Sequence, residues 1–448
     1  MTNTSADGER LPRTLGLWSA VAVLVGSTIG SGIYRVPARV ADTVGEPQII
    51  LLAWVLGGVI ALAGALTMAE LAAAMPRSGG VFAYILEAFG PLPAFLFGWT
   101  ELAVVRASAL GAIATIFAEY LGYFIPLTAP QIRYVAAAAV VLVGIFNYVG
   151  VGAAARLMNV VTLAKFAALA AIVALAVASG EGSASNFTGA GAHLASTSLV
   201  FTALVSIMWT YDGWADIAYM GGEVRNPAKT LPQALIIGTA AIVVIYLCLN
   251  LAFLYLVPAA EMGQSKLIAA TAAERIGAFG GRGGAIISAV VLVSCFGSLN
   301  GSMMTGPRIF FAMADRGLFF PSIARVSPRF QSPSVAIGLA TALGVGYVLL
   351  NDFQQLADKF ILGIWPFYAL AVAAVFVLRR TQPALPRPYL TLGYPVVPAV
   401  FLVASVAMVL NAIVTDPRNT GVTFGIIGAG IPAYYLWRAR GTASVKGG

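Results

Sequence analysis

The chain has 448 residues, of which 59% are hydrophobic and only 10% are charged. A soluble domain carries about 25% charged residues, so this composition and the mean hydropathy of +0.88 exclude a soluble protein and indicate that most of the chain faces lipid. Two cysteines and a single histidine, His193, exclude a disulfide scaffold and a histidine-based metal site. The net charge of +8 does not indicate a nucleic-acid-binding protein, because the basic residues punctuate apolar segments instead of forming a patch.

Long apolar segments follow one another through the whole chain. A membrane-spanning helix needs about 20 apolar residues, and the segments are too long and too continuously apolar for barrel strands. The sequence therefore predicts an all-α integral membrane protein with twelve transmembrane helices. In chain order these cover residues 15–41, 48–75, 91–122, 131–150, 156–178, 198–222, 232–257, 284–313, 334–350, 358–378, 391–413 and 420–437.

The distribution of basic residues predicts the orientation. Cytoplasmic loops carry an excess of Lys and Arg, and with the N-terminus inside, the inner segments hold sixteen of these residues while the outer ends hold eight. An even number of spans returns the C-terminus to the same side. We therefore expect a multi-pass protein of the plasma (inner) membrane with both termini in the cytoplasm. The polar start at residues 1–14 argues against a cleaved signal peptide.

Two of the predicted helices are interrupted in the same manner. The first contains the run from Gly26 to Gly32, and the sixth contains the run from Trp209 to Trp214. If the chain is divided near residue 190, each interrupted helix is the first of a set of five helices. Because five is an odd number, the second set crosses the membrane in the opposite orientation to the first. Paired, interrupted helices at matching positions of two halves indicate the midplane binding site of a transporter.

These observations predict a single transmembrane transporter domain with an inverted five-plus-five repeat. The domain covers residues 1–440. Repeat one occupies about 15–178, repeat two about 198–379, and two accessory helices about 391–437.

The glycines and hydroxyls between Gly26 and Gly32 predict an unwound stretch. Its backbone groups need partners, because lipid offers none. The N-terminus of the outer half-helix suits a carboxylate, and free carbonyls suit an ammonium group. The alternative is close helix packing through Gly26 and Gly30, a small-xxx-small pair. The matching break in the sixth helix favours a ligand site.

Several charged residues remain inside the predicted membrane. Asp212 either contacts a substrate or caps the outgoing half-helix, and Lys165 either braces the first helix or carries a proton; we favour the brace. Trp209 is either a packing aromatic or a gate. Glu101 and Arg106 lie five residues apart, which does not match the same-face spacing of three or four in an α-helix, so we expect no pair between them.

Several of these motifs resemble those of a known family. The run from Gly26 to Tyr34 resembles the first-helix motif of the amino acid–polyamine–organocation superfamily. Its L-amino-acid transporter branch is similar in further motifs, over about residues 14–380. These are Met68 to Leu71, Ser78 to Gly80, Tyr84, Tyr211 to Trp214, Glu223 to Pro227 and Leu231-Pro232. The resemblance implies the leucine-transporter fold and the movement of amino acids by alternating access.

The resemblance also implies roles for the residues of the two breaks. By motif position, Ser31 and Gly32 offer N–H or hydroxyl groups to a substrate carboxylate, and the carbonyls of Thr28, Trp209 and Asp212 receive the amine. Trp209 matches the gating aromatic of the family. Lys165 matches a lysine that, in sodium-independent members, occupies the sodium position near Gly26. The predicted substrate-binding residues are Thr28, Ile29, Gly30, Ser31, Gly32, Trp209, Tyr211, Asp212 and Gly213.

The sequence thus predicts sodium-independent exchange or uptake of neutral L-amino acids, without a cofactor or a metal ion. The segment 122–132 has no cysteine, so no disulfide-linked heavy chain is expected as a partner. Asp212 stands where many animal members have glycine, which leaves open a proton-coupled or exchange carrier of cationic amino acids or polyamines. A sensor that binds an amino acid without moving it is disfavoured because no soluble output domain is visible, and an enzyme because no catalytic pair has a suitable spacing.

Overall fold

The computed structural model describes residues 15–76, 79–149, 154–188, 196–315 and 332–445, together with Arg13, Phe320, Ile323 and Ser327. Throughout these residues the secondary structure is helical, apart from one isolated parallel bridge between Leu15 and Val224. Seven helices are long and apolar enough to cross a membrane. The predicted all-α integral membrane class is therefore confirmed. Ser78 and His193, which the sequence analysis names, lie outside the described residues.

The seven long spans alternate with shorter helices along the chain. One span is continuous over Pro91–Leu121 although it changes its winding at η2. The spans are α3 (Pro47–Ala74), α5 (Pro91–Thr100) with η2 (Glu101–Arg106) and α6 (Ala107–Leu121), α7 (Ala129–Val149), α11 (Pro227–Leu256), α14 (Gly283–Asp315), α16 (Phe353–Thr381) and α17 (Val396–Thr415).

The remaining predicted spans also contain helices. They are α1 (Leu17–Thr28) with η1 (Gly32–Tyr34) and α2 (Val36–Val44), α8 (Ala154–Ser179), α9 (Thr197–Tyr211) with α10 (Asp216–Tyr219) and η4 (Gly221–Glu223), α15 (Ser334–Leu350) and α18 (Pro417–Val445). Helix therefore occurs in each of the twelve predicted segments. The count of twelve spans and the inverted repeat stay predictions.

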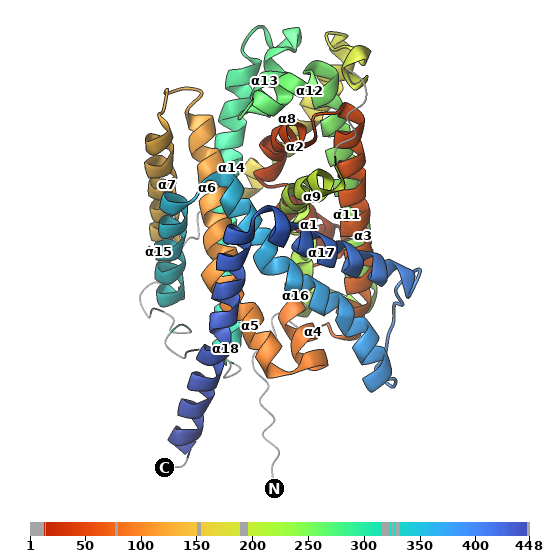
Figure 1. Ribbon diagram of the computed structural model, residues 1–448, viewed down its shortest axis with the longest axis vertical. Helices are drawn as coiled ribbons and strands as arrows, with labels where there is room; N and C mark the ends of the chain where they lie inside the picture. The colour runs from red at the N-terminus through yellow and green to blue at the C-terminus, as the bar shows by residue number, and fades with distance from the viewer. Residues whose placement is uncertain are drawn as a thin grey trace.

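Short helices outside the predicted spans close the two ends of the bundle. At one end lie α12 (Ala259–Gln264) and α13 (Ile268–Glu274), and at the other end lies α4 (Gly80–Phe89) (Figure 1). Two further turns, η3 (Ala184–Phe187) and η5 (Gly277–Phe279), belong to the connections between helices.

The broken helices lie inside the bundle. α3 and α11 pack together on one side, α7 and α15 on the other, and α1 and α9 run between them (Figure 1). Ile29 and Ile33 beside the first break are fully buried, whereas apolar residues such as Val403 of α17 are exposed. Exposed apolar side chains on a membrane helix face lipid, and the first break lies in the buried interior of the bundle.

The ends of α1 and α10 are joined by backbone pairing. The N–H of Leu15 donates to the carbonyl of Glu223 at 3.0 Å, and the N–H of Arg225 donates to the carbonyl of Leu15 at 2.8 Å. This pairing is the bridge between Leu15 and Val224, and it ties the entry of α1 to the exit of η4.

The expectation that Glu101 and Arg106 do not pair is wrong. Residues Glu101–Arg106 form a π-helical turn, in which the backbone repeats from residue i to i+5. This winding brings Arg106 Nη2 to 3.3 Å from Glu101 Oε2. Arg106 Nη1 also donates to the Ser302 hydroxyl at 2.9 Å, so the pair connects the Pro91–Leu121 span to α14.

A buried ion pair connects the ends of α3 and α16. Glu70 is 1% exposed, and its carboxylate accepts hydrogen bonds from Arg379 at 2.8 and 2.6 Å. The N–H and the hydroxyl of Thr391 donate to the same carboxylate at 2.8 and 2.7 Å. A buried carboxylate is tolerated only with such partners, and these partners come from α16 and from the segment before α17.

Replacing Glu70 by Ala is expected to destabilise the fold strongly. Removing one partner of a buried ion pair leaves the other uncompensated, which costs about 3–5 kcal/mol. The measurement is the thermal unfolding midpoint of the purified protein in detergent. Glu261→Ala is the matched control, because Glu261 is 48% exposed and pairs with Arg275 on the surface, where a pair contributes about 0–1 kcal/mol. Equal shifts of the midpoint in both variants would contradict this account.

Candidate functional site

The first break follows α1, a helix that is too short to cross a membrane by itself. Its 12 residues rise about 18 Å, compared with a hydrocarbon core of about 30 Å. The hydroxyls of Ser27 and Thr28 both donate to the carbonyl of Leu24, at 3.0 and 2.9 Å, and such back-bonding favours the end of a helix. The chain leaves the helical conformation at Ile29 and resumes it at Gly32.

Two side chains hold the carbonyl groups at this break. Lys165 Nζ of α8 donates to the carbonyls of Gly26 at 2.9 Å and Ile29 at 2.5 Å. The hydroxyl of Tyr246 in α11 donates to the carbonyl of Thr28 at 2.9 Å. Both side chains are buried, with exposed fractions of 4% and 0%. Carbonyls that leave a helix in an apolar medium require such donors.

The N–H groups on the other side of the break have no such partner within the described residues. Within the described residues, the N–H groups of Ser31, Gly32 and Ile33 donate to no protein acceptor. All three residues are buried, and the turn they form leads directly into α2. Unpaired N–H groups at the start of a helix favour an anion, because the helix dipole adds a positive potential there.

The second break packs directly against the first. α9 ends at Tyr211, Asp212 is extended and Gly213 has a φ of +108°. A Cβ atom on Gly213 would lie 2.9 Å from the Cα atom of Thr28, and one on Gly32 would lie 3.0 Å from the Thr210 hydroxyl. Only glycine allows these close approaches and this φ. The two interrupted helices therefore meet backbone to backbone.

Asp212 is engaged by a side chain from a third helix. Its Oδ1 atom accepts a hydrogen bond from the hydroxyl of Tyr368 in α16 at 3.0 Å. The alternative that Asp212 caps the outgoing half-helix is wrong, because α10 begins at Asp216 and Ala215 occupies its N-cap position without a side-chain bond. The physical reason is the three-residue turn after Asp212, which separates its carboxylate from the first turn of α10.

The aromatic residues of the second break have distinct positions. The ring of Trp209 packs edge-on against Phe360 of α16, with centroids 4.8 Å apart. In the described part of the chain, the buried Trp209 Nε1 and Thr210 Oγ1 atoms have no hydrogen-bond partner, and both residues lie against Gly32. Together with the open N–H groups they form a polar lining beside the break.

Tyr211 supports the site from behind rather than facing Gly32. Its hydroxyl donates to the carbonyl of Trp54 in α3 at 3.2 Å, and its ring centroid lies 5.3 Å from that of Tyr246. Since Tyr246 holds the Thr28 carbonyl, Tyr211 positions a donor of the first break.

Three residues at the site are absent from the sequence prediction, namely Tyr246, Phe360 and Tyr368. The two tyrosines carry a signal that sequence reading can use, because a tyrosine hydroxyl in the middle of an apolar span needs a polar partner. Phe360 carries no such signal, since its contact with Trp209 depends on the packing of α16 against α9.

The amino acid permease family model matches residues 15–434, an interval that includes both breaks. The chain belongs to the amino acid permease family. The resemblance to the amino acid–polyamine–organocation superfamily and its L-amino-acid transporter branch is thereby confirmed.

Several characterised members of the permease family are similar to the chain over most of its length. The serine/threonine exchanger SteT of Bacillus subtilis is 31% identical over 96% of this chain and 98% of its own length. The human b(0,+)-type amino acid transporter 1 is 32% identical, over 91% of this chain and 84% of its own length. The human cystine/glutamate transporter is 31% identical, over 96% and 86%.

In this permease, Gly213→Ala is expected to abolish transport. The added methyl group meets the Thr28 backbone at 2.9 Å, and a positive φ costs a residue with a Cβ about 1–2 kcal/mol. The measurement is uptake of labelled amino acids into proteoliposomes. Gly45→Ala is the matched control, because Gly45 has a φ of +71° with nothing within 4 Å. Gly45→Ala introduces the backbone strain of a positive φ but no steric clash, so this variant should still transport amino acids. Equal loss of transport in both variants would contradict the contact between the breaks.

Proposed function

We propose that the protein is a secondary transporter that moves L-amino acids across the membrane by alternating access. The observation that carries this proposal is the meeting of two interrupted helices, with buried N–H groups of Ser31, Gly32 and Ile33 that find no protein acceptor in the described chain. The names of its relatives, which include a serine/threonine exchanger and a b(0,+)-type amino acid transporter, support the same substrate class. Like these relatives, it acts as a transporter and not as an enzyme.

In this proposal the substrate lies between the two breaks as a zwitterion. Its carboxylate accepts from the N–H groups of Ser31, Gly32 and Ile33 at η1, because N–H groups without an acceptor suit an anion. Its ammonium group lies toward the backbone carbonyls of Thr28, Trp209 and Asp212. Gly30 leaves room beside the break, Ile29 and Gly213 belong to the backbone around it, and Trp209 covers the site. An added Cβ on Gly30 would meet no atom closer than 3.8 Å, which supports a ligand beside it.

The proposal includes the twelve-helix inverted repeat over residues 1–440, in the plasma membrane with both termini in the cytoplasm. Membrane insertion and orientation are supported by the apolar helices and by the excess of basic residues on one side. No disulfide-linked heavy chain is included, because residues 122–132 have no cysteine and both cysteines, Cys248 and Cys295, lie within membrane helices.

Transport in this proposal is independent of sodium. Lys165 places its ammonium group on the carbonyls of Gly26 and Ile29, which are the type of ligand that a sodium ion uses. A second cation beside it would be repelled. In this proposal the protonated lysine supplies the positive charge that a sodium ion would bring.

Exchange of labelled amino acids in proteoliposomes tests this proposal. We expect the rate to remain unchanged when choline replaces sodium. Lys165→Met is expected to lower it by about tenfold or more, because hydrogen bonds from a charged donor contribute about 1.5–3 kcal/mol each. Lys359→Met is the matched control, since Lys359 is also buried but contacts Asn419 of α18. Strong sodium dependence, or normal exchange by Lys165→Met, would refute the role of the lysine.

A second candidate is a proton-coupled or exchange carrier of cationic amino acids or polyamines. It is favoured by the carboxylate of Asp212, which lies at the second break with only a neutral hydroxyl bonded to Oδ1. A carboxylate there attracts a second ammonium group of a substrate.

Asp212→Asn distinguishes the two candidates. The amide keeps the size of the side chain and can still accept from Tyr368 but removes the charge. The measurement is competition of labelled uptake by lysine and by leucine in parallel. If the carrier is cationic, competition by lysine is lost and that by leucine persists. If the carrier is specific for neutral amino acids, lysine does not compete for uptake by the native protein or by the variant. If lysine still competes for uptake by the variant, this role for Asp212 is excluded.

A further inference from the structure

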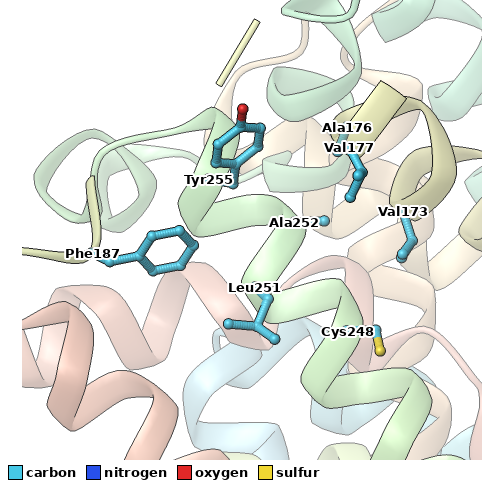
Figure 2. Close-up of a pocket in the computed structure, with 8 residues that line it drawn as sticks. All are labelled: Val173, Ala176, Val177, Phe187, Cys248, Leu251, Ala252 and Tyr255. Carbon is cyan, nitrogen blue, oxygen red and sulfur yellow. The ribbon is translucent and has the colours of Figure 1, made fainter. Parts of the chain in front are cut away.

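An apolar groove opens on the outside of the bundle, away from the two breaks. It has a volume of 420 Å³, within the range of about 300–1,000 Å³ for ligand pockets. Its walls come from α8, from the connection at η3 and from α11 (Figure 2). The lining residues are Val173, Ala176, Val177, Phe187, Cys248, Leu251, Ala252 and Tyr255.

The groove is continuous with the surface that faces lipid. Val177 on one wall is 75% exposed and Leu251 on the other is 44% exposed, in helices that belong to the membrane bundle. Cys248 lies eight residues before Leu256, the end of α11, which is a rise of about 12 Å. The groove therefore reaches from the end of the span toward the middle of a hydrocarbon core of about 30 Å, close to the depth of one leaflet.

A polar rim closes the end of the groove next to the membrane surface. The N–H of Ser183 and the side-chain amide of Asn186 donate to the carbonyl of Tyr255 at 2.9 and 3.0 Å. The ring of Phe187 stacks on that of Tyr255, with centroids 6.5 Å apart. The combination of an apolar interior, a side open to lipid and a polar rim at the surface matches the amphipathic outline of a phospholipid.

The two walls also carry the donors that hold the first break. Lys165 precedes Val173 by eight residues on α8, and Tyr246 precedes Cys248 by two residues on α11. These two donors hold the carbonyls of Gly26, Ile29 and Thr28. The helices that form the groove are therefore the helices that hold the first break.

We propose that this groove binds one acyl chain of a phospholipid of the surrounding bilayer, and that its occupancy changes the rate of transport. The first half of the proposal depends only on the groove; the second half rests on the proposed function. The chain lies between α8 and α11, with its headgroup at the rim that Ser183 and Asn186 form. Removing it lets the two helices approach each other and alters the grip of Lys165 and Tyr246 on the first break.

A photoreactive phospholipid tests the binding. The protein is reconstituted with a trace of phosphatidylethanolamine that carries a diazirine in its acyl chain, irradiated, and mapped by peptide mass spectrometry. We expect saturable labelling of the groove residues as the probe fraction rises, and only linear labelling of the exposed face of α17. Linear labelling at both places, or cross-linking of the groove to another protein chain, would overturn the proposal.

Substitutions that fill the groove provide the control. Leu251→Trp and Val177→Trp enlarge exposed side chains on opposite walls so that they fill the groove, and each is expected to lose the saturable labelling. Val403→Phe on α17, where the native side chain is 69% exposed to lipid, should keep it. The thermal unfolding midpoint identifies a variant that fails to fold. If one filling variant fails to fold, the other still tests the site. Saturable labelling that survives in a folded filling variant would refute the site.

The rate of amino acid exchange tests the coupling separately. We expect a changed rate in the filling variants and an unchanged rate in Val403→Phe. An unchanged rate together with lost labelling would refute the coupling and leave the lipid site intact. If the native protein does not transport amino acids, the proposed function fails, while the labelling result still decides on the groove.

Discussion

The constraint on which the structure depends is that a peptide group inside a bilayer must have a hydrogen-bond partner, because lipid supplies none. Every unbroken helix meets this requirement internally. α1 and α9 do not, and the surrounding side chains follow from that fact. Lys165 and Tyr246 cover the carbonyls on one side of the first break, while the glycines at 32 and 213 let the two backbones touch. The N–H groups that remain are the part of the requirement that, in the proposed function, a substrate fulfils.

The charged and polar groups of the site lie in separate places around the two breaks. The ammonium group of Lys165 on α8 lies on the carbonyl side, and the N–H groups without an acceptor in the described chain lie in the turn at η1, before α2. Asp212 lies across the contact, held by Tyr368. This division explains why three helices that are far apart in sequence, α8, α11 and α16, each send one polar side chain to the same region. A helix that lacked this side chain would leave a backbone group or a carboxylate without a partner.

Much of this organisation could be predicted from the sequence. Hydropathy locates helix in all twelve segments. Glycine and hydroxyl residues locate the first break, and the run from Trp209 to Trp214 with Asp212 locates the second, because these signals are local. The role of a residue that acts through packing cannot be predicted from the sequence around it. Tyr246 and Phe360 acquire their roles only when α11 and α16 lie against the breaks. Glu101 and Arg106 were separated by an assumption of regular α-helix, and the π-helical turn between them leaves no mark in hydropathy.

The backbone pairing of Leu15 with Glu223 and Arg225 has a mechanical consequence. It joins Leu15, just before α1, to residues that follow α10, so two segments from different halves of the chain share one short ladder. Either they swing as one unit when this end opens, or the ladder separates. Two backbone hydrogen bonds contribute about 1–3 kcal/mol in total, less than the roughly 8 kcal/mol that a micromolar ligand releases on binding. The free energy of ligand binding is therefore large enough to offset the loss of this ladder.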